Sequence, residues 1–334
     1  MANPRFLVIR MGSMGDIVHT LPAVAALRSA FPQAQVDWLV ERKWAPLLEG
    51  NSEISAVIPI ERRDLGSVAR TIKRLRSAEY STAIDFQGLY KSAALALASG
   101  ASRRIGFAGD FAREAAAALM YNSPVTPVGK HVVEQNLSLA EMAGAQKGKI
   151  RFPLPRDTEA EFRMARQLEA GQLEDYFVLS PGGGWGSKCW PTERYGELHE
   201  CLYERLGWRG IISYGPGEES LCLEVCRAAG ESKPLPVPMN LVELMAMLRR
   251  ARFVVAADTG PLHLAAALGT PVVALYGPTD PARNGPYPPD GNTVVRNAEP
   301  DEITYSRGGE YSRAMLSINV DQVVKAVMGR IGMA

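Results

Sequence analysis

Cysteine and histidine are scarce in this sequence, with four of each among 334 residues, and their scarcity limits metal and redox chemistry. All four cysteines lie in the second half of the chain, at Cys189, Cys201, Cys222 and Cys226. The last two are spaced i,i+4 on a predicted helix, but no further Cys or His pair completes a set of zinc ligands. No Asp-X-Asp motif follows a predicted strand either. We therefore expect free thiols in a reducing compartment and no metal site.

Excess charge and long apolar runs are also lacking. Lys and Arg total 37 against 36 Asp and Glu, so the formal net charge is only +1, which argues against a nucleic-acid binder. No apolar run approaches the ~20 residues that a membrane-spanning helix needs. The N-terminal MANPRFLVIR has charges on both sides of a four-residue apolar run, which is typical of a first strand and not of a signal peptide. The sequence predicts a cytoplasmic protein without a nucleic-acid partner.

What the sequence does contain is a regular alternation of short apolar runs and helical segments. Such alternation predicts parallel, doubly wound sheets, and 334 residues are too many for one ordinary core. The polar segment Gly144–Pro155 is rich in Gly, Lys and Pro, which is typical of an interdomain linker. We therefore predict α/β domains at residues 1–155 and 156–318. A final helix from Val320, within residues 319–334, is expected to pack back across the first domain.

The most informative stretch runs from Phe253 to Pro281. Two continuous apolar runs, Phe253–Ala257 and Pro271–Tyr276, are typical of strands buried on both faces of a parallel sheet, and an alanine-rich helix separates them. The helix should begin at the carboxyl end of the first strand, where backbone N–H groups and the helix dipole favour anions. A capped structural helix would explain the cap residues alone. A glycine, a histidine and the polar loop 277–280 favour a ligand site formed by Asp258, Thr259, Gly260 and His263.

The first predicted strand, Arg5–Arg10, ends in a turn, Met11–Asp16, that contains two glycines. Glycine lets the backbone turn tightly and approach a ligand closely, yet the turn matches neither GxGxxG nor a Walker A loop. Asp16 lies where a helix should begin, so its role is either functional or that of an N-cap, and the sequence leaves both open. His19 and Thr20 follow one turn later and could face the same loop.

A second glycine-rich loop, Pro181–Lys188, follows the predicted strand Tyr176–Ser180. Its N–H groups, a hydroxyl and one lysine suit a phosphate, although glycine loops often serve only to turn the chain. After the next strand, Glu218 or Glu219 begins a helix. Either carboxylate could accept hydrogen bonds from a ribose diol or simply favour the helix dipole.

Basic residues follow several predicted strands. Those between Arg70 and Arg76 lie along a helix and are expected to form a solvated face. Arg62, Arg63 and Arg113 instead follow strand ends, so they are better placed to meet an anionic substrate.

Five motifs occur in the order found in one enzyme family: RFLVIRMGSMGDIVHTLPA, VDWLVE, IDFQGLYKSA, KCWP and VVAADTGPLHLAAALGTPVVALYGPTDP. With two doubly wound domains, each with a glycine loop after its first strand, the chain resembles the GT-B glycosyltransferases of family 9. Within that family it most resembles the lipopolysaccharide heptosyltransferases of type I. The resemblance covers nearly the whole chain. It implies two Rossmann-like domains that face each other across a cleft.

The resemblance also implies a reaction. Family members of this type transfer L-glycero-D-manno-heptose from ADP-heptose, with inversion and without a metal or other cofactor. The acceptor would be a Kdo residue of Kdo2-lipid A at the cytoplasmic face of the inner membrane, which the enzyme would meet peripherally. Two alternatives remain open: another family 9 transferase, for example one like heptosyltransferase II, and a catalytically silent nucleotide-binding module.

Matched motif by motif, the resemblance assigns roles to residues. Asp16 matches the catalytic base, and Lys188 matches a residue that stabilises the departing phosphates. Donor contacts are implied for Ser187, Lys188, Asp258, Thr259, Gly260 and His263, with Glu218 or Glu219 at the ribose. Acceptor contacts are implied for Gly15, Arg62, Arg63 and Arg113.

Overall fold

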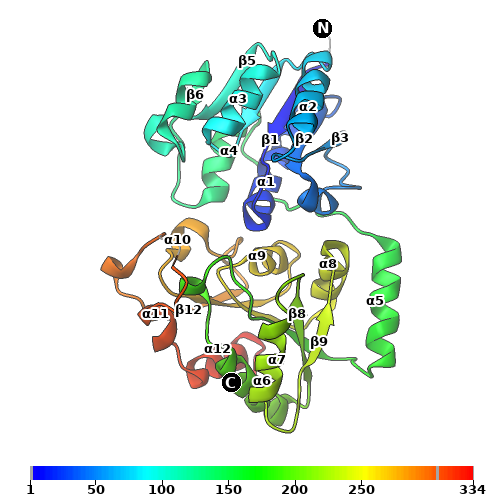
Figure 1. Ribbon diagram of the computed structural model, residues 1–334, viewed down its shortest axis with the longest axis vertical. Coiled ribbons are helices and arrows are strands. Elements are labelled where there is room, and N and C mark those ends of the chain that lie inside the picture. The colour runs from blue at the N-terminus through cyan, green and yellow to red at the C-terminus, as the bar shows by residue number, and fades with distance from the viewer. Residues whose placement is uncertain (1–2, 306–307, 334) are drawn as a thin grey trace. The chain divides into compact units, whose positions relative to one another are not determined.

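The computed structural model describes residues 3–305 and 308–333. The chain divides into two compact units, Met1–Pro155 and Arg156–Ala334 (Figure 1). Within the described residues, each unit contains one six-stranded sheet with helices on both faces. The prediction of two doubly wound α/β units is confirmed.

The first sheet has the strand order β3-β2-β1-β4-β5-β6, and every neighbouring pair runs parallel. Its strands are β1 (Arg5–Ile9), β2 (Gln35–Glu41), β3 (Ala56–Ile60), β4 (Thr82–Asp85), β5 (Arg103–Phe107) and β6 (Ser123–Val125). Helices α1 (Met14–Ala30) and α4 (Val132–Met142) pack together on one face, whereas α2 (Leu65–Ser77) and α3 (Tyr90–Ala98) cover the other. Three short 3-10 helices complete the unit: η1 (Arg42–Leu47), η2 (Gly109–Phe111) and η3 (Ala115–Met120).

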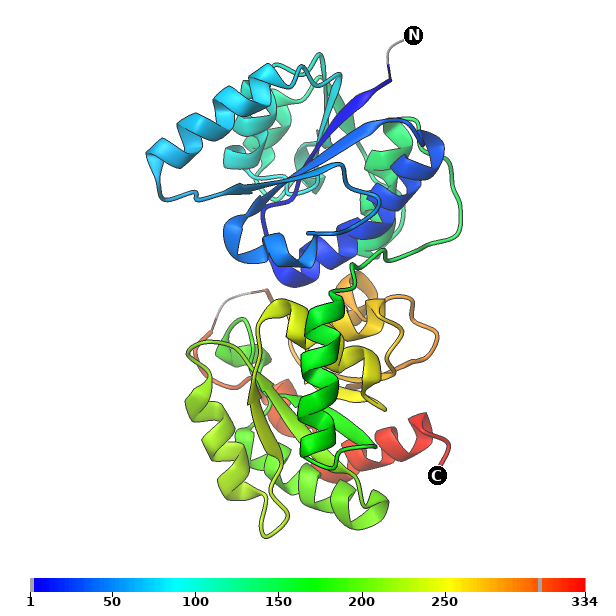
Figure 2. The same cartoon turned by 90° about the vertical axis from the view of Figure 1, so that its right-hand side faces the viewer.

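The second sheet repeats this arrangement, with the order β12-β11-β10-β7-β8-β9 and parallel pairs throughout. Its strands are β7 (Tyr176–Ser180), β8 (Arg209–Tyr214), β9 (Leu235–Pro238), β10 (Val254–Ala257), β11 (Val272–Tyr276) and β12 (Asn292–Arg296). One face carries α6 (Thr192–Leu206), α7 (Glu219–Ala228) and α12 (Val320–Arg330). The other carries α5 (Thr158–Ala170), α8 (Leu241–Arg250) and α9 (Gly260–Ala267), with α5 in front of the sheet in Figure 2. Shorter helices are η4 (Gly186–Lys188), α10 (Pro281–Asn284), η5 (Pro300–Glu302) and α11 (Arg313–Ser317).

In each sheet the first three strands follow one another in one direction, and the fourth strand then lies on the other side of the first. Strand β1 lies beside β4 in the first sheet, and β7 lies beside β10 in the second. The connections from two such neighbours leave toward opposite faces, so a crevice opens at their carboxyl ends, and ligands of open α/β sheets bind there. The turn Met11–Asp16 follows β1, and the loop Pro181–Lys188 follows β7. The fold therefore places both predicted glycine loops at these points.

Burial explains which strands could be predicted from the sequence. Every residue of β7, β10 and β11 is buried, so these strands form the continuous apolar runs typical of a parallel sheet covered on both faces. Strands β6, β9 and β12 lie at sheet edges and contain exposed positions. These three edge strands were not predicted.

The C-terminal helix α12 belongs to the second unit. Its buried residues Val323, Val324 and Val327 join the core formed by β7, β8, β10 and β11, and the helix contacts α6, β11 and β12. The expectation that residues 319–334 pack across the first domain is therefore wrong. Valines at i, i+1 and i+4 form one apolar stripe, which is buried here against the part of the second sheet beside α6.

Replacing Val327 with alanine should destabilise the second unit by about 2 kcal/mol, since the side chain is fully buried and its loss leaves a cavity. Hydrogen exchange should become faster in β11 and β12 and stay unchanged in β1 to β6. Lys325→Ala on the exposed face of the same helix is the control and should alter neither unit. Faster exchange confined to the first unit would contradict this placement of α12.

Candidate active site

The turn after β1 presents Asp16 in the first turn of α1. One oxygen of its carboxylate accepts hydrogen bonds from the backbone N–H and the hydroxyl of Ser13, the N-cap residue, both at 3.1 Å. Arg10 forms an ion pair of 2.5 Å with the other oxygen. Asp16 thus completes a capping box, as its structural interpretation requires, and also carries an ion pair that a cap does not need.

Asp16 is held as a carboxylate. Burial alone would raise its pKa, but the charge of Arg10, the Ser13 hydrogen bonds and the charge of Arg113 hold the pKa below its ordinary value of 3.8. The Asp16 side chain is 26% exposed, whereas that of Arg10 is only 6% exposed. A buried guanidinium therefore fixes a partly accessible carboxylate that is ionised at neutral pH.

Arg113, one of the predicted acceptor residues, lies beside this turn. Its charge is close enough to lower the pKa of the Asp16 carboxyl. Its backbone packs against Gly88, which follows β4 and has a φ of +65°, and a Cβ on Gly88 would lie 3.1 Å from the Arg113 nitrogen. The loop after β4 therefore needs glycine, both for its left-handed backbone and to admit the Arg113 segment.

Arg62 reaches the same region through Glu41, the last residue of β2. The two side chains form an ion pair, and Glu41 Oε2 lies 3.9 Å from the position that a Cβ on Gly12 would take. Glu41 was not singled out in the sequence, because the predicted strand ended one residue earlier, at Val40. Arg63 is exposed, and Gly15 is buried in the first turn of α1, so their acceptor contacts stay predictions.

His19 and Thr20 do not face the turn. His19 is 3% exposed and Thr20 is fully buried. Asn136 of α4 donates to the backbone oxygen of His19 at 3.0 Å, and the Thr20 hydroxyl donates to the backbone oxygen of Asp16 at 2.8 Å. One turn into α1 the same side of the helix is covered by α4, so the expectation of a shared loop face is wrong.

In the second unit, the glycine loop after β7 carries Lys188 to the carboxyl end of β10. Lys188 is the last residue of η4, and its ammonium group forms an ion pair with Asp258, the residue that follows β10. The ammonium nitrogen also lies 4.2 Å from the centroid of the Trp185 ring. The two side chains are 10% and 4% exposed, so a nearly buried ion pair joins the two strand ends.

Asp258 is surrounded by further polar side chains. His263 Nε2 lies 3.1 Å from its carboxylate, Thr279 donates at 2.8 Å, Asn284 Nδ2 donates to both oxygens at 3.1 and 3.0 Å, and the Tyr276 hydroxyl lies at 3.5 Å. Burial alone would raise the pKa of Asp258. The hydrogen bond and charge of His263, together with Lys188, instead hold it far below its usual range.

These contacts indicate how Asp258 acts. Its oxygens already accept hydrogen bonds from protein donors, and its charge would repel a diphosphate. The carboxylate is placed to orient Lys188, which is the cation that can meet an anion. A direct donor contact through the Asp258 side chain stays a prediction that this geometry does not favour.

The start of α9 lies next to this cluster. Thr259 is the N-cap of the helix and Gly260 its first residue, so the free N–H groups of the first turn lie beside Asp258. The hydroxyls of Thr259 and Ser187 are buried and have no hydrogen-bond partner among the described residues. Buried hydroxyls are normally paired, so these two side chains suit the oxygens of a polar ligand.

The structure also separates Glu218 from Glu219. Glu218 accepts a hydrogen bond of 2.8 Å from the Gly215 N–H, and its carboxylate packs against Gly182 so closely that any side chain at residue 182 would collide with it. Glu219 is exposed in the first turn of α7. Glu218 thus faces the glycine loop and is the better placed of the two for a nucleotide ribose.

Comparison with known proteins identifies the family. The profile described as "Glycosyltransferase family 9 (heptosyltransferase)" matches residues 68–311, which is more than half of the chain. The chain belongs to glycosyltransferase family 9. Lipopolysaccharide heptosyltransferase 1 of Pseudomonas aeruginosa is 33% identical over 85% of this chain and 81% of its own length. The corresponding protein of Salmonella typhimurium is 31% identical over 85% of this chain and 91% of its own.

A solved structure supports the same relationship. E. coli heptosyltransferase WaaC with ADP is 28% identical and matches with a TM-score of 0.79 over 98% of this chain and 99% of its own. The family assignment makes the present protein a glycosyltransferase with the GT-B fold. It also agrees with the two Rossmann-type strand orders observed in its sheets.

Among the described residues of this glycosyltransferase, no three His, Cys, Asp or Glu side chains are grouped so that they could hold a metal ion. Within the same residues, no helix combines the length and apolarity needed to cross a bilayer. The positive charge of Lys188 and the backbone N–H groups at the start of α9 suit a phosphate.

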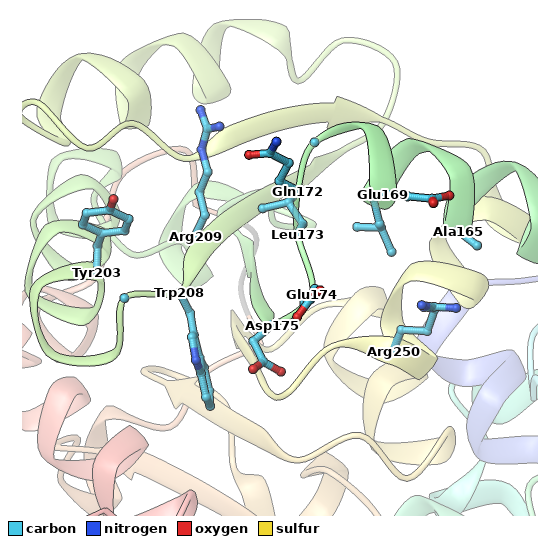
Figure 3. A pocket seen from close by; sticks show the side chains of 13 residues that line it. Ala165, Glu169, Gln172, Leu173, Glu174, Asp175, Tyr203, Trp208, Arg209 and Arg250 are labelled. Atoms are coloured by element: carbon cyan, nitrogen blue, oxygen red, sulfur yellow. The ribbon is translucent and has the colours of Figure 1, made fainter.

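A surface pocket of about 730 Å³ lies elsewhere in the second unit (Figure 3). It is lined by the end of α5, the segment before β7, the start of β8 and Arg250 at the end of α8. Arg209, Trp208 and Asp175 are among its lining residues in Figure 3. All these segments precede their strands, so the pocket is at the amino ends of the sheet and is separate from the Lys188–Asp258 pair.

Sequence reasoning missed several members of the candidate site. Arg10 and Glu41 lie at strand ends, and Tyr276, Thr279 and Asn284 follow one another around the end of β11. The PTDPARN segment carried the only available signal, because it is polar and directly follows a buried strand. Thr279 and Asn284 of this segment donate hydrogen bonds to Asp258, which lies 21 and 26 residues earlier in the chain. No local spacing reveals such a contact.

Proposed function

We propose that this enzyme transfers L-glycero-D-manno-heptose from ADP-heptose to a Kdo residue of Kdo2-lipid A, in the assembly of the lipopolysaccharide inner core. The names of its relatives, lipopolysaccharide heptosyltransferases of type 1, support the sugar and the acceptor class. The ADP bound by the E. coli structure supports the nucleotide. The observation that carries the proposal is Lys188, fixed by Asp258 beside the N-terminus of α9 at the end of β7 and β10.

The proposed transfer is one in-line displacement with inversion. The acceptor hydroxyl attacks the anomeric carbon of the heptose as the bond from that carbon to the ADP oxygen breaks. Asp16, already ionised, accepts the hydroxyl proton, and ADP leaves with the electron pair. Lys188 and the first-turn N–H groups of α9 stabilise the charge that develops on the diphosphate.

The remaining candidates receive roles in the same scheme. Ser187, Thr259, Gly260 and His263 surround the diphosphate and the sugar, and Glu218 binds the ribose. Arg62, Arg63 and Arg113 meet the carboxylate and phosphate groups of the acceptor, because guanidinium groups bind such anions in pairs of hydrogen bonds. Since the acceptor is a lipid, the enzyme works at the cytoplasmic face of the inner membrane and meets that surface peripherally.

A second candidate is a family 9 transferase with another acceptor, such as that of heptosyltransferase II. Both reactions release ADP from ADP-heptose, so the acceptor distinguishes them. Turnover with a heptosylated core and none with Kdo2-lipid A would favour the second candidate.

ADP release from ADP-heptose should require Kdo2-lipid A and should change by less than about 2-fold when EDTA is added, because Lys188 and α9 supply the positive charge that a divalent cation gives other transferases. A coupled assay for ADP measures this directly, and an enzyme dialysed against EDTA and then supplied with Mg²⁺ is the control. Loss of activity on dialysis with recovery on Mg²⁺ would overturn the metal-independent mechanism. Absence of ADP release from ADP-heptose in the presence of Kdo2-lipid A would overturn the proposed reaction.

A further inference from the structure

Asp258 joins three neighbouring loops of the second sheet. Its own segment follows β10, Lys188 comes from the loop after β7, and Thr279 and Asn284 come from the segment after β11. These strands are adjacent in the sheet, and Figure 1 shows α9 and α10 at the same end of the unit. The carboxylate is therefore the common hydrogen-bond acceptor of loops that are far apart in sequence.

Both the side chain and the backbone of Asn284 form hydrogen bonds. Its side-chain nitrogen donates to both oxygens of Asp258, at 3.1 and 3.0 Å. Its backbone oxygen accepts a hydrogen bond of 2.8 Å from the hydroxyl of Tyr276, a fully buried residue at the end of β11. An amide held in this way has one orientation, with its nitrogen directed at the carboxylate.

The negative charge of Asp258 competes with a diphosphate for Lys188. A buried carboxylate next to Lys188 neutralises the cation that a diphosphate needs. Neutral donors that share the carboxylate reduce its demand for Lys188, because hydrogen bonds to an ionised acceptor are strong and stabilise its charge. Thr279 supplies one such bond and Asn284 supplies two.

We propose that Asn284 and Thr279 are positioning residues which hold the Asp258 carboxylate and thereby leave Lys188 available to the diphosphate of the donor. They act through Asp258 and do not themselves contact the phosphates. The inference rests on the proposed function, because it takes a nucleoside diphosphate as the ligand of Lys188. It adds two residues, from the segment after β11, that the proposed reaction does not otherwise require.

Binding of ADP and of adenosine, measured by calorimetry on the full chain, separates this role from a general structural one. Adenosine lacks the diphosphate, so it reports the nucleoside part of the site alone. Asn284→Asp keeps the size of the side chain and replaces its two donated hydrogen bonds with a second negative charge. We expect ADP affinity to fall about 30-fold and adenosine affinity to change less than about 2-fold.

Two further variants keep the test decisive. Thr279→Val removes one donor without adding charge and should weaken ADP about 5-fold with adenosine unchanged, which tests the idea even if Asn284→Asp does not fold. Asn297→Asp adds the same charge at an exposed position beyond β12 and should leave both affinities unchanged.

Each outcome has a distinct meaning. Unchanged ADP affinity in Asn284→Asp and Thr279→Val, or an equal loss for ADP and adenosine, overturns the inference while the proposed function stands. A wild-type enzyme that binds ADP no better than adenosine overturns the proposed donor instead. A selective loss of ADP affinity in both variants, absent from Asn297→Asp, supports the role of Asn284 and Thr279.

Discussion

Replacing Asp16 with asparagine should lower kcat about 10³-fold while ADP affinity changes less than about 2-fold. Asparagine keeps the size of the side chain and can still accept hydrogen bonds from Ser13, so the start of α1 is preserved. What is lost is the ability to accept a proton from the acceptor hydroxyl. A general base of this kind typically contributes 10²–10⁴-fold, and a variant without it should bind the donor and fail to turn over.

Steady-state ADP release and calorimetric ADP binding measure the two halves of this expectation. Ser13→Ala is the matched control, because it removes one hydrogen bond from the Asp16 carboxylate but leaves the carboxylate in place. It should retain most of the activity. Normal turnover in Asp16→Asn, or a loss of ADP affinity as large as the loss of rate, would show that Asp16 serves only as a helix cap.

The environment of Asp16 also sets the expected pH dependence. Because Arg10, Ser13 and Arg113 hold the Asp16 pKa below its ordinary value of 3.8, the carboxylate stays ionised as the pH falls from 8 toward 5. Loss of kcat/KM through protonation of this group should therefore occur only below about pH 4. An acid limb near pH 6 that disappears in Asp16→Asn would show that the base has a raised pKa in the working enzyme.

The interior of the fold could be predicted because burial on both faces leaves a strong local signal. Strands β7, β10 and β11 are apolar at nearly every position, and their lengths are short enough to exclude helices. The edge strands β6, β9 and β12 lack this signal. Strands β6 and β9 contain prolines, which a sheet edge tolerates, and β12 alternates irregularly between polar and apolar residues.

The candidate site divides in the same way. Glycine loops and helix starts are local features, so the segments around Asp16, Lys188 and Asp258 could be located from the sequence. The contacts within the second unit are not local: Lys188 and Asp258 are 70 residues apart, and Asn284 is 26 residues beyond Asp258. Only the strand order brings these residues together at the carboxyl ends of β7, β10 and β11, and hydrophobic periodicity does not specify that order.

Helix α12 shows a different limit. Its amphipathic pattern predicts that one side is buried, and that prediction is confirmed by Val323, Val324 and Val327. The pattern does not say which surface covers that side. The partner is decided by the neighbouring helix α6, by the interior strand β11 and by the edge strand β12, which was not predicted.

Replacing Lys188 with methionine should reduce kcat/KM about 10³-fold or more, through both weaker donor binding and slower transfer. Lys188 is the cation at the end of β7 and β10, and the loss of one preorganised group that stabilises charge in a transition state costs about 10²–10³-fold in kcat. Ground-state attraction to the diphosphate adds to this loss. The methionine side chain keeps a similar volume, so the packing against Trp185 should survive.

The same substitution removes the partner of a nearly buried carboxylate, and this complicates its interpretation. Breaking such a pair from one side typically destabilises a protein by about 3–5 kcal/mol, because the remaining charge is buried without compensation. The double variant Lys188→Met/Asp258→Asn removes both charges and should recover much of that stability in urea unfolding. It should not recover activity or ADP affinity, because the cation is still absent. A double variant that is stable and active would show that the ion pair only supports the fold, whereas a stable and inactive one would place Lys188 in the chemistry of the departing ADP.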